Sequence, residues 1–285
     1  MTADEVTELA RCTWPHWPLQ TVTLFSDDGW DCQVFVVDDD WLLRVPRTPR
    51  ARTHLGWEMR MLDRLAPRLP LLVPHYVRRA PWGGVYRRLA GVGDDALGAE
   101  AGGRVGRFLA ALHATEPRGR HLERRRRAWR RRFARLGLEL ERVVWPRLGA
   151  PGGKRARAWY RAALARWDAG GPAVALIHGD LSLEHLLAEA GEVVAVIDFG
   201  DMTWGDPMLD FAGLGVLGAE ARAAYRRPVD EAAVAFYQQL SPLYGVLRAL
   251  RRGEPAGLVD ASLAAWSQPS GEAGVLPSGG GTTWT

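Results

Sequence analysis

The chain has 285 residues, of which 47% are hydrophobic and 25% are charged, and its formal net charge is +4. This balance is typical of a globular protein with a sizeable core, so it excludes wholesale disorder, a collagen-like fibre and a disulfide scaffold. No apolar run approaches the roughly 18 to 20 residues that span a bilayer. With two cysteines and a polar N-terminal segment that lacks an apolar signal core, we expect a cytoplasmic protein.

The first 90 residues alternate between strand and helix patterns. Three short β-rich runs separated by polar turns predict a meander of strands at 21–25, 33–37 and 41–45. Apolar residues at three- and four-residue spacing then predict a helix over 51–66. Two further apolar runs predict strands at 71–77 and 85–89. We therefore expect residues 1–90 to form a small, strand-rich lobe.

From about residue 98 the pattern is mainly helical. Buried strands are predicted only at 174–177 and 193–197, and Pro151-Gly152-Gly153 is expected to break the chain. The apolar spacing predicts helices around 105–112, 129–144, 154–168, 208–218, 229–240 and 242–252. Residues 267–285 are rich in Gly, Ser, Thr and Pro and are expected to form a disordered tail.

The most informative stretch covers residues 176–214. Asp180 and Asp198 each follow a short apolar strand, and His185 lies five residues after Asp180. A turn near Gly191 returns the chain, so both aspartates are expected at the same end of the strands. Phosphoryl transfer needs such a set, because one carboxylate orients the attacking hydroxyl while a second carboxylate and a neighbouring ligand hold Mg²⁺ on the nucleotide phosphates.

The pattern HGD-xxxx-H followed by IDFGD-xxx-GDP-xx-DF resembles the aminoglycoside phosphotransferases, which share the fold of protein kinases. That family typically has Asn where His185 lies, but its 2''-phosphotransferases and the macrolide phosphotransferases also carry His. The IDFGD sequence and the DF at the end of the pattern resemble the 2''-phosphotransferases more closely. Over residues 20–255, the resemblance implies a two-lobe α+β fold, with a nucleotide-binding lobe at 1–90 and a catalytic, substrate-binding lobe at 91–266.

The resemblance also implies roles for individual residues. Asp180 would orient the substrate hydroxyl, and His185 with Asp198 would hold Mg²⁺. Residues 43–47 resemble the family's lysine-bearing strand, so Arg44 would grip the nucleotide phosphates, positioned by Glu58 on the following helix. Residues 28–32 fall where the family has its short nucleotide loop. The interlobe hinge, whose backbone would read the base of ATP or GTP, matches Arg87, Arg88, Leu89 and Ala90.

Two departures from the family pattern have chemical consequences. Lys154 is the only lysine in the chain, so no ordinary lysine–glutamate pair can form. Arg44 keeps the charge and can bind phosphate bidentately, but a weakened or degenerate nucleotide site is the competing interpretation. Imidazole is less usual around Mg²⁺ and must be neutral to ligate, so activity should fall at acid pH.

A polycationic acceptor favours a carboxylate-lined cleft. The candidates are Asp201, Asp206, Asp230 and Glu231, with Glu254 on a later helix. We assign Asp210 a structural role in bracing the catalytic loop, and we expect His178 to hold that loop rather than to react.

We therefore expect a monomeric or weakly dimeric, nucleotide-dependent O-phosphotransferase that inactivates an aminoglycoside-type antibiotic, with no nucleic-acid or membrane partner. One alternative changes the acceptor to a macrolide, another natural product, or a metabolite such as homoserine or choline. A second is a non-catalytic kinase-like binding protein. A third is an RNA-binding protein that uses the arginine run at 124–127, which we interpret as the solvated face of an amphipathic helix.

Overall fold

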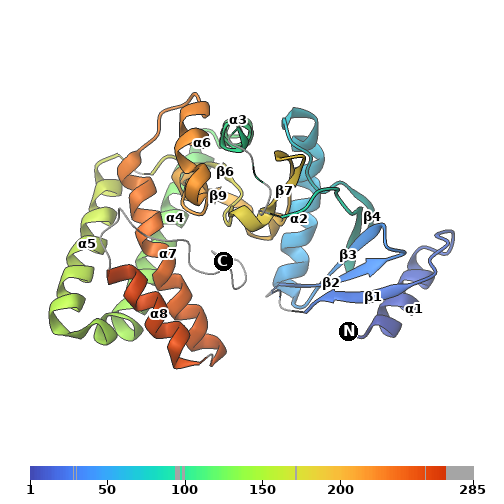
Figure 1. The fold of residues 1–285 in the computed structure, drawn as a ribbon, viewed down its shortest axis with the longest axis horizontal. Helices are drawn as coiled ribbons and strands as arrows, with labels where there is room; N and C mark the ends of the chain where they lie inside the picture. Colours follow the sequence, from blue (N-terminus) through green and yellow to red (C-terminus); the bar gives the residue numbers. More distant parts are fainter. Residues whose placement is uncertain are drawn as a thin grey trace. The chain divides into compact units, whose positions relative to one another are not determined.

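The computed structural model describes residues 1–27, 29, 31–93, 97, 100–170, 172–253 and 255–267. By their contacts these residues form two compact units. The first unit comprises Met1–Ala99 and His185–Gly200, and the second comprises Glu100–Glu184 and Asp201–Thr285. The expected tail lies outside the described residues, apart from Ser267. The expected α+β fold, with a strand-rich N-terminal part and a helical C-terminal part, is confirmed (Figure 1).

The first unit is built on one five-stranded antiparallel sheet with the strand order β1-β2-β3-β5-β4. The strands are β1 Val22–Ser26, β2 Cys32–Val37, β3 Trp41–Pro46, β4 Tyr76–Ala80 and β5 Gly83–Arg87. Alternate residues of β2 and β3 point to opposite faces. Phe35, Val37, Leu43 and Val45 are buried in a core on one face, so Arg44 points to the other.

Helix α1 (Ala3–Thr13) covers the core face, where Val6 and Ala10 pack. The spacing of apolar residues does not predict this helix, but a capping motif at its N-terminus does. The side chain of Thr2 accepts a hydrogen bond from the backbone of Glu5, whose carboxylate accepts one from the backbone of Thr2. This capping box is readable as Thr-x-x-Glu.

Helix α2 (Pro49–Leu65) follows β3 and contacts β3 and β5. Thr48 caps its N-terminus and Pro49 occupies the first turn, where proline is favoured because its missing N–H has no intrahelical partner. The strand predicted at 71–77 is wrong for most of its length, since β4 begins at Tyr76. Pro74 removes a ladder donor just before it.

Residues 185–200 add a hairpin to the first unit. It consists of β7 (Leu186–Glu189) and β8 (Glu192–Val196), which turn at Gly191. Backbone hydrogen bonds join Leu72 to Val194 and Val196, at 3.0 and 2.9 Å, and Val92 to Ala188, at 3.0 and 2.8 Å. These bonds explain why a segment expected in the second lobe groups with the first unit.

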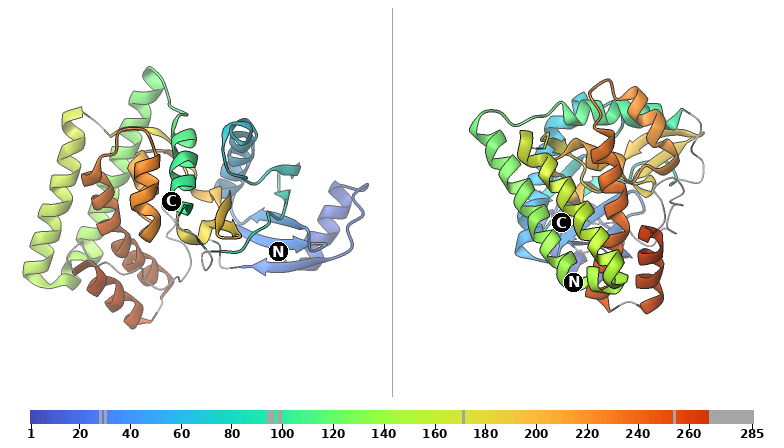
Figure 2. Two further views of the ribbon diagram at one scale, coloured as in Figure 1. Left: turned by 45° about the horizontal axis from the view of Figure 1, so that its top comes forward. Right: turned by 90° about the vertical axis from the view of Figure 1, so that its left-hand side faces the viewer.

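The second unit is mainly helical. Its helices are α3 Ala101–His113, α4 Arg120–Val143, α5 Gly149–Gly170, α6 Gly218–Ala224, α7 Glu231–Arg252 and α8 Ala256–Ser267. The long helix α4 lies beside α5 and α7 (Figures 1 and 2). A two-stranded antiparallel ladder pairs β6 (Ala175–Ile177) with β9 (Thr203–Gly205). No helix in the described part of the chain is both long and apolar enough to cross a bilayer.

Three helix predictions need correction. Pro151 does not break the chain, because it lies in the first turn of α5, where a missing N–H has no intrahelical partner to lose. The two helices predicted at 229–240 and 242–252 form the single helix α7, with Pro242 inside it. Its buried residues Tyr237, Leu240 and Leu243 continue the same packed stripe past the proline. Residues 208–218 form short 3-10 turns (Pro207–Phe211 and Gly215–Leu217) before α6 instead of one helix.

Candidate active site

Arg44 and Glu58 form a buried ion pair in the first unit. Nη1 of Arg44 lies 2.7 Å from Oε1 of Glu58, and the two residues are 7% and 1% exposed. Burial alone would lower the pKa of Arg44, but the neighbouring Glu58 carboxylate raises it well above its usual value. Burial raises the pKa of Glu58, and Arg44 opposes that shift. The guanidinium is therefore a fixed, permanently charged group on this face of the sheet.

Asp198 lies near the guanidinium of Arg44 and the imidazole of His185, both in the same unit. Its Oδ1 is 3.6 Å from Nη2 of Arg44, and its Oδ2 is 3.8 Å from Nε2 of His185. The side chain of Asp198 is 53% exposed, whereas that of His185 is only 9% exposed. Asp198 has a φ of +58°, an uncommon conformation for a residue with a side chain.

The carboxylate of Asp198 and the imidazole of His185 are suitable ligands for a magnesium ion bound to a nucleotide. Among the residues that the structure describes, no three His, Cys, Asp or Glu side chains form a ready-made metal cluster. Mg²⁺ in nucleotide sites is held by one or two carboxylates, with phosphate and water oxygens completing its shell. An exposed carboxylate beside an imidazole meets this lower requirement, and the Arg44 guanidinium lies next to that carboxylate.

Half-buried apolar side chains share the sheet face of Arg44. Val34 lies directly opposite Arg44 in the β2–β3 register, and Val36 lies opposite Leu42. Tyr86 pairs with Leu42 from the other side. Val34, Val36 and Leu42 are neither fully buried nor exposed, so this strip offers an apolar surface next to the cation. The sequence motifs that predict the site do not include this apolar strip.

The predicted hinge follows directly from β5. Arg87 pairs with Trp41, and the backbone N–H of Arg88 donates to Asp40 O at 2.8 Å. Arg87, Arg88 and Ala90 are exposed and Leu89 is half-buried. The segment ends at Gly91, whose φ of +110° and close approach to Leu187 and Ala188 exclude a side chain.

The predicted nucleotide loop is described only in part, because Asp28 and Trp30 lie outside the described residues. Arg47 fixes its flanks by donating to the carbonyl of Asp27 at 2.5 Å and to the carbonyl of Gly29 at 2.9 Å. Arg47 also pairs with the carboxylate of Asp27.

In the second unit, Asp210 braces the loop that carries Asp180. The N–H groups of His178 and Gly179 donate to its two carboxylate oxygens at 2.7 and 2.8 Å, and Nε2 of His113 lies 3.0 Å from Oδ2. The observed contacts agree with the bracing role predicted for Asp210. Asp180 is 5% exposed, so the residue is buried directly after the segment that Asp210 braces.

Gly179 lets the chain pass close to Asp201. It has a φ of +90°, and a Cβ there would lie 2.3 Å from the carbonyl oxygen of Asp201 and 3.4 Å from its Cβ. Only glycine fits. The structure thus brings the backbone of Asp201, one of the predicted acceptor-binding residues, beside the loop that carries Asp180.

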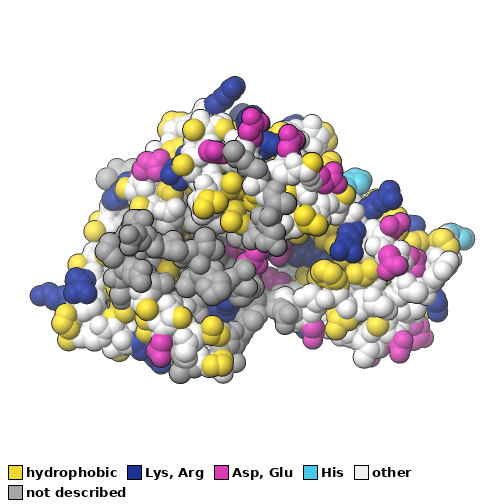
Figure 3. All heavy atoms as spheres, in the orientation of Figure 1, with side chains coloured by type: hydrophobic (Ala, Val, Ile, Leu, Met, Phe, Trp, Pro, Cys, Tyr) yellow, Lys and Arg dark blue, Asp and Glu magenta, His cyan; other side chains and the backbone are white. Residues whose placement is uncertain are grey.

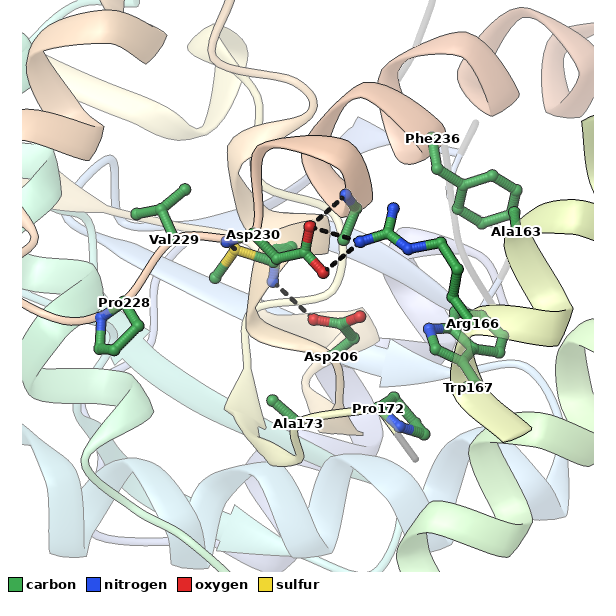
Figure 4. Close-up of a pocket in the computed structure, with 12 residues that line it drawn as sticks. Ala163, Arg166, Trp167, Pro172, Ala173, Asp206, Pro228, Val229, Asp230 and Phe236 are labelled. Carbon is green, nitrogen blue, oxygen red and sulfur yellow. Dashed lines mark hydrogen bonds and ion pairs between the residues drawn. The ribbon is translucent and has the colours of Figure 1, made fainter. Parts of the chain in front are cut away.

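Asp206 and Asp230 line a different part of the second unit, a pocket of about 330 Å³ shown in Figure 4. Asp230 accepts two hydrogen bonds of 2.8 Å from Arg166. Burial raises the pKa of Asp206 to about 6, opposed by hydrogen bonds from the Met208 backbone and the Tyr237 hydroxyl. Ala173, just before β6, lines this pocket, whereas Asp180 follows the other end of β6.

Glu231 lies next to Asp230 but outside the pocket lining. Its carboxylate is 3.2 Å from Nε of Arg222, and its side chain is 67% exposed. The remaining acceptor candidate, Glu254, lies outside the described residues.

A family model described as the phosphotransferase enzyme family, APH, matches residues 21–250. The chain belongs to this family. It is therefore a phosphotransferase that acts on an alcohol group, and the predicted resemblance is confirmed. No curated protein sequence matches the chain.

Several solved structures share the fold of this phosphotransferase. The GDP and kanamycin complex of the aminoglycoside phosphotransferase APH(2'')-IIIa is 18% identical, with a TM-score of 0.75, and covers 92% of this chain and 97% of that chain. The macrolide 2'-phosphotransferase MphH from Brachybacterium faecium, as the apoenzyme, is 28% identical, with a TM-score of 0.62, over 94% and 98% of the two chains. The streptomycin–ATP complex of APH(2'')-IIa is 16% identical, with a TM-score of 0.66, over 92% and 95%.

Some arginines of α4 in the phosphotransferase make contacts with other side chains of the second unit. Arg126 pairs with Glu123 at 3.0 Å, and Arg125 lies over the ring of Trp204 at 5.8 Å. On the face shown in Figure 3, Lys and Arg side chains are interspersed with Asp and Glu side chains. These contacts fit the amphipathic-helix interpretation of residues 124–127.

Proposed function

We propose that this phosphotransferase transfers the γ-phosphate of ATP or GTP to a hydroxyl of an aminoglycoside-type antibiotic and so inactivates it. The observation that carries the proposal is the cluster on the first unit, in which Arg44 lies between Glu58 and Asp198, with His185 beside Asp198. A buried cation next to an exposed carboxylate and an imidazole is suited to a nucleotide whose phosphates carry a divalent ion.

In this proposal the nucleotide binds to the first unit. Its base contacts the apolar strip of Val34, Val36 and Leu42 and the backbone of residues 87–90, and its phosphates contact Arg44. Asp198 and His185 would hold Mg²⁺, which would neutralise phosphate charge when bound. Because Glu58 already fixes Arg44, no large rearrangement of the cation is needed before phosphate binds.

Asp180 is proposed as the residue that receives the acceptor hydroxyl. The hydroxyl proton passes to Asp180, and the oxygen forms a bond to the γ-phosphorus. The bond from phosphorus to the bridging oxygen breaks, leaving a nucleoside diphosphate. Asp210 and His113 support this role, since they fix the backbone of residues 178 and 179.

Asp201 is proposed as a contact for an ammonium group of the acceptor, because its backbone packs against Gly179, the residue before Asp180. Asp206, Asp230 and Glu231 stay predictions for the same role. Arg166 and Arg222 already compensate the charges of Asp230 and Glu231. A cationic acceptor would therefore have to compete with arginine at these two positions.

A macrolide is the second candidate acceptor. The observation that favours it is the 28% identity with the macrolide 2'-phosphotransferase MphH, which exceeds the identity of the aminoglycoside enzymes compared above. Macrolides carry fewer amines than aminoglycosides, so the two acceptors place different demands on Asp201.

The variant Asp180→Asn tests the mechanism. We expect turnover to fall by about two to four orders of magnitude, because the amide cannot accept the hydroxyl proton, while the affinity for Mg²⁺-nucleotide stays within about twofold. The matched control is Asp63→Asn, which removes a carboxylate that pairs with Arg79 at the surface. Turnover retained in Asp180→Asn would show that another residue accepts the proton.

A further inference from the structure

Tyr76 brings a third polar group to the buried Arg44–Glu58 pair. Its hydroxyl donates to Oε1 of Glu58 at 2.9 Å and accepts from Nη1 of Arg44 at 3.3 Å. Tyr76 is 3% exposed, so water does not compete for these bonds. None of the sequence motifs that locate the site includes this residue.

The sheet leaves space for the Tyr76 ring at Gly84. Gly84 lies opposite Arg44 in the β3–β5 register. A Cβ at Gly84 would lie 2.7 Å from Cδ1 of Tyr76 and 2.8 Å from Sδ of Met59. A side chain at this position would therefore displace the ring. The ring also contacts Tyr86 edge-on, with the centroids 5.1 Å apart, so its hydroxyl is held in place beside the guanidinium.

An arginine needs such a partner more than a lysine does. The lysine ammonium is a compact charge with three rotatable donors, whereas the guanidinium is a planar fork whose five N–H groups are oriented together. In Arg44, Nη1 is shared between Glu58 and Tyr76, while Nη2 points toward Asp198 at 3.6 Å. Because Nη1 is held by both Glu58 and Tyr76, the guanidinium cannot swing about one hydrogen bond. The direction in which Nη2 points is therefore fixed as well.

We propose that Tyr76 is a positioning residue that orients the Arg44 guanidinium for binding nucleotide phosphate, an inference that rests on the proposed function. Burial raises the pKa of Tyr76 well above its usual value, so its hydroxyl keeps its proton near neutral pH and donates to Glu58. The hydroxyl acts through Arg44 and does not touch the reacting atoms.

The test is a double-mutant cycle of Tyr76→Phe and Arg44→Lys, read from the KM for Mg²⁺-nucleotide. Tyr76→Phe keeps the ring and removes the hydroxyl. In the Arg44 background we expect the nucleotide KM to rise about five- to tenfold, since a hydrogen bond to a charged group is lost, with the acceptor KM unchanged. In the Arg44→Lys background the same change should alter the nucleotide KM less than about twofold. Equal effects in both backgrounds would overturn the proposal.

Two controls separate positioning from stability. Tyr160→Phe removes another buried hydroxyl, which donates to the carbonyl of Phe133 in the second unit at 2.6 Å. It should lower the Tm and leave the nucleotide KM unchanged. Tyr76→His, which keeps a ring with a polar donor, should restore part of the nucleotide affinity that Tyr76→Phe loses. It also supplies a second variant if Tyr76→Phe folds poorly, and a nucleotide KM equal to that of Tyr76→Phe would argue against positioning.

Failure of this inference is distinguishable from failure of the proposed function. If Arg44→Ala weakens nucleotide binding and Tyr76→Phe does not, only the role of Tyr76 is wrong. If the unaltered protein binds no Mg²⁺-nucleotide, or if Arg44→Ala leaves binding unchanged, the nucleotide site itself is wrong.

Discussion

Arg44 occupies a buried position between two carboxylates, Glu58 and Asp198. A buried guanidinium without a partner would be strongly destabilising, so Glu58 makes the charge tolerable before any ligand arrives. Asp198 remains half exposed and therefore accessible to an ion. At the scale of single residues, a buried carboxylate stabilises the cation while the second carboxylate stays half exposed to solvent.

Asp206 gives a pH-dependent prediction. Its pKa is about 6 in the folded protein, against 3.8 for an ordinary aspartate. As pH rises from about 4 to about 6 the unfolded chain loses this proton first, so the group's contribution to the free energy of unfolding falls across that window and is lost above it. At about 1.4 kcal/mol per pKa unit, the total change is about 3 kcal/mol.

The measurement compares the unaltered protein with Asp206→Asn by chemical denaturation at about pH 4 and about pH 7. The stability advantage of the unaltered protein should shrink or reverse at the higher pH, because the amide does not titrate. Asp63→Asn is the control of opposite sign, since a hydrogen bond from Arg79 lowers the pKa of Asp63. A stability advantage over Asp206→Asn that grows with pH would contradict the account.

At the scale of elements, α3 and α6 pack unusually closely. A Cβ at Gly106 of α3 would lie 2.1 Å from the carbonyl oxygen of Ala221 in α6. Gly106→Ala should therefore force the helices apart and lower the free energy of unfolding by about 3 kcal/mol. The loop held by His113, at the end of α3, would be disturbed with it.

Gly103→Ala on the same helix is the matched control. A Cβ there would meet only the end of the Arg107 side chain, at 3.6 Å. Because alanine has the higher helix propensity, this variant should be more stable by up to about 1 kcal/mol. Urea denaturation of both variants measures the effect, and equal stabilities would contradict the close packing of α3 on α6.

The elements also show what local sequence can and cannot predict. Turn residues and short apolar, β-rich runs suffice for β2 and β3, and the Thr2–Glu5 capping box would suffice for α1. The continuity of α7 through Pro242 could not be predicted, because it depends on contacts with distant parts of the chain, such as the hydrogen bond from Trp129 of α4 to the hydroxyl of Tyr237. Pro151 misleads because the cost of a proline depends on which turn of the helix it occupies.

For the whole molecule, the part of the candidate site that sequence can predict consists of residues that lie close together in the chain. Asp180, His185, Asp198 and Asp210 all fall within residues 176–214, so a local motif is enough to single them out as candidates. The Arg44–Glu58 pair needed a family resemblance, because its members come from a strand and a helix. Tyr76 could not be predicted, since its contact depends on the empty space at Gly84, which only the folded sheet reveals.

The most direct test of the central claim is phosphoryl transfer by the unaltered protein. The protein is incubated with Mg²⁺ and either ATP or GTP, across a panel of aminoglycosides and macrolides, and the products are analysed by mass spectrometry. The account predicts one added phosphoryl group on an aminoglycoside hydroxyl, formed with release of nucleoside diphosphate and abolished by chelating Mg²⁺. Phosphorylation confined to macrolides would contradict the acceptor proposed here, and no phosphorylated product with any acceptor or nucleotide would contradict the central claim.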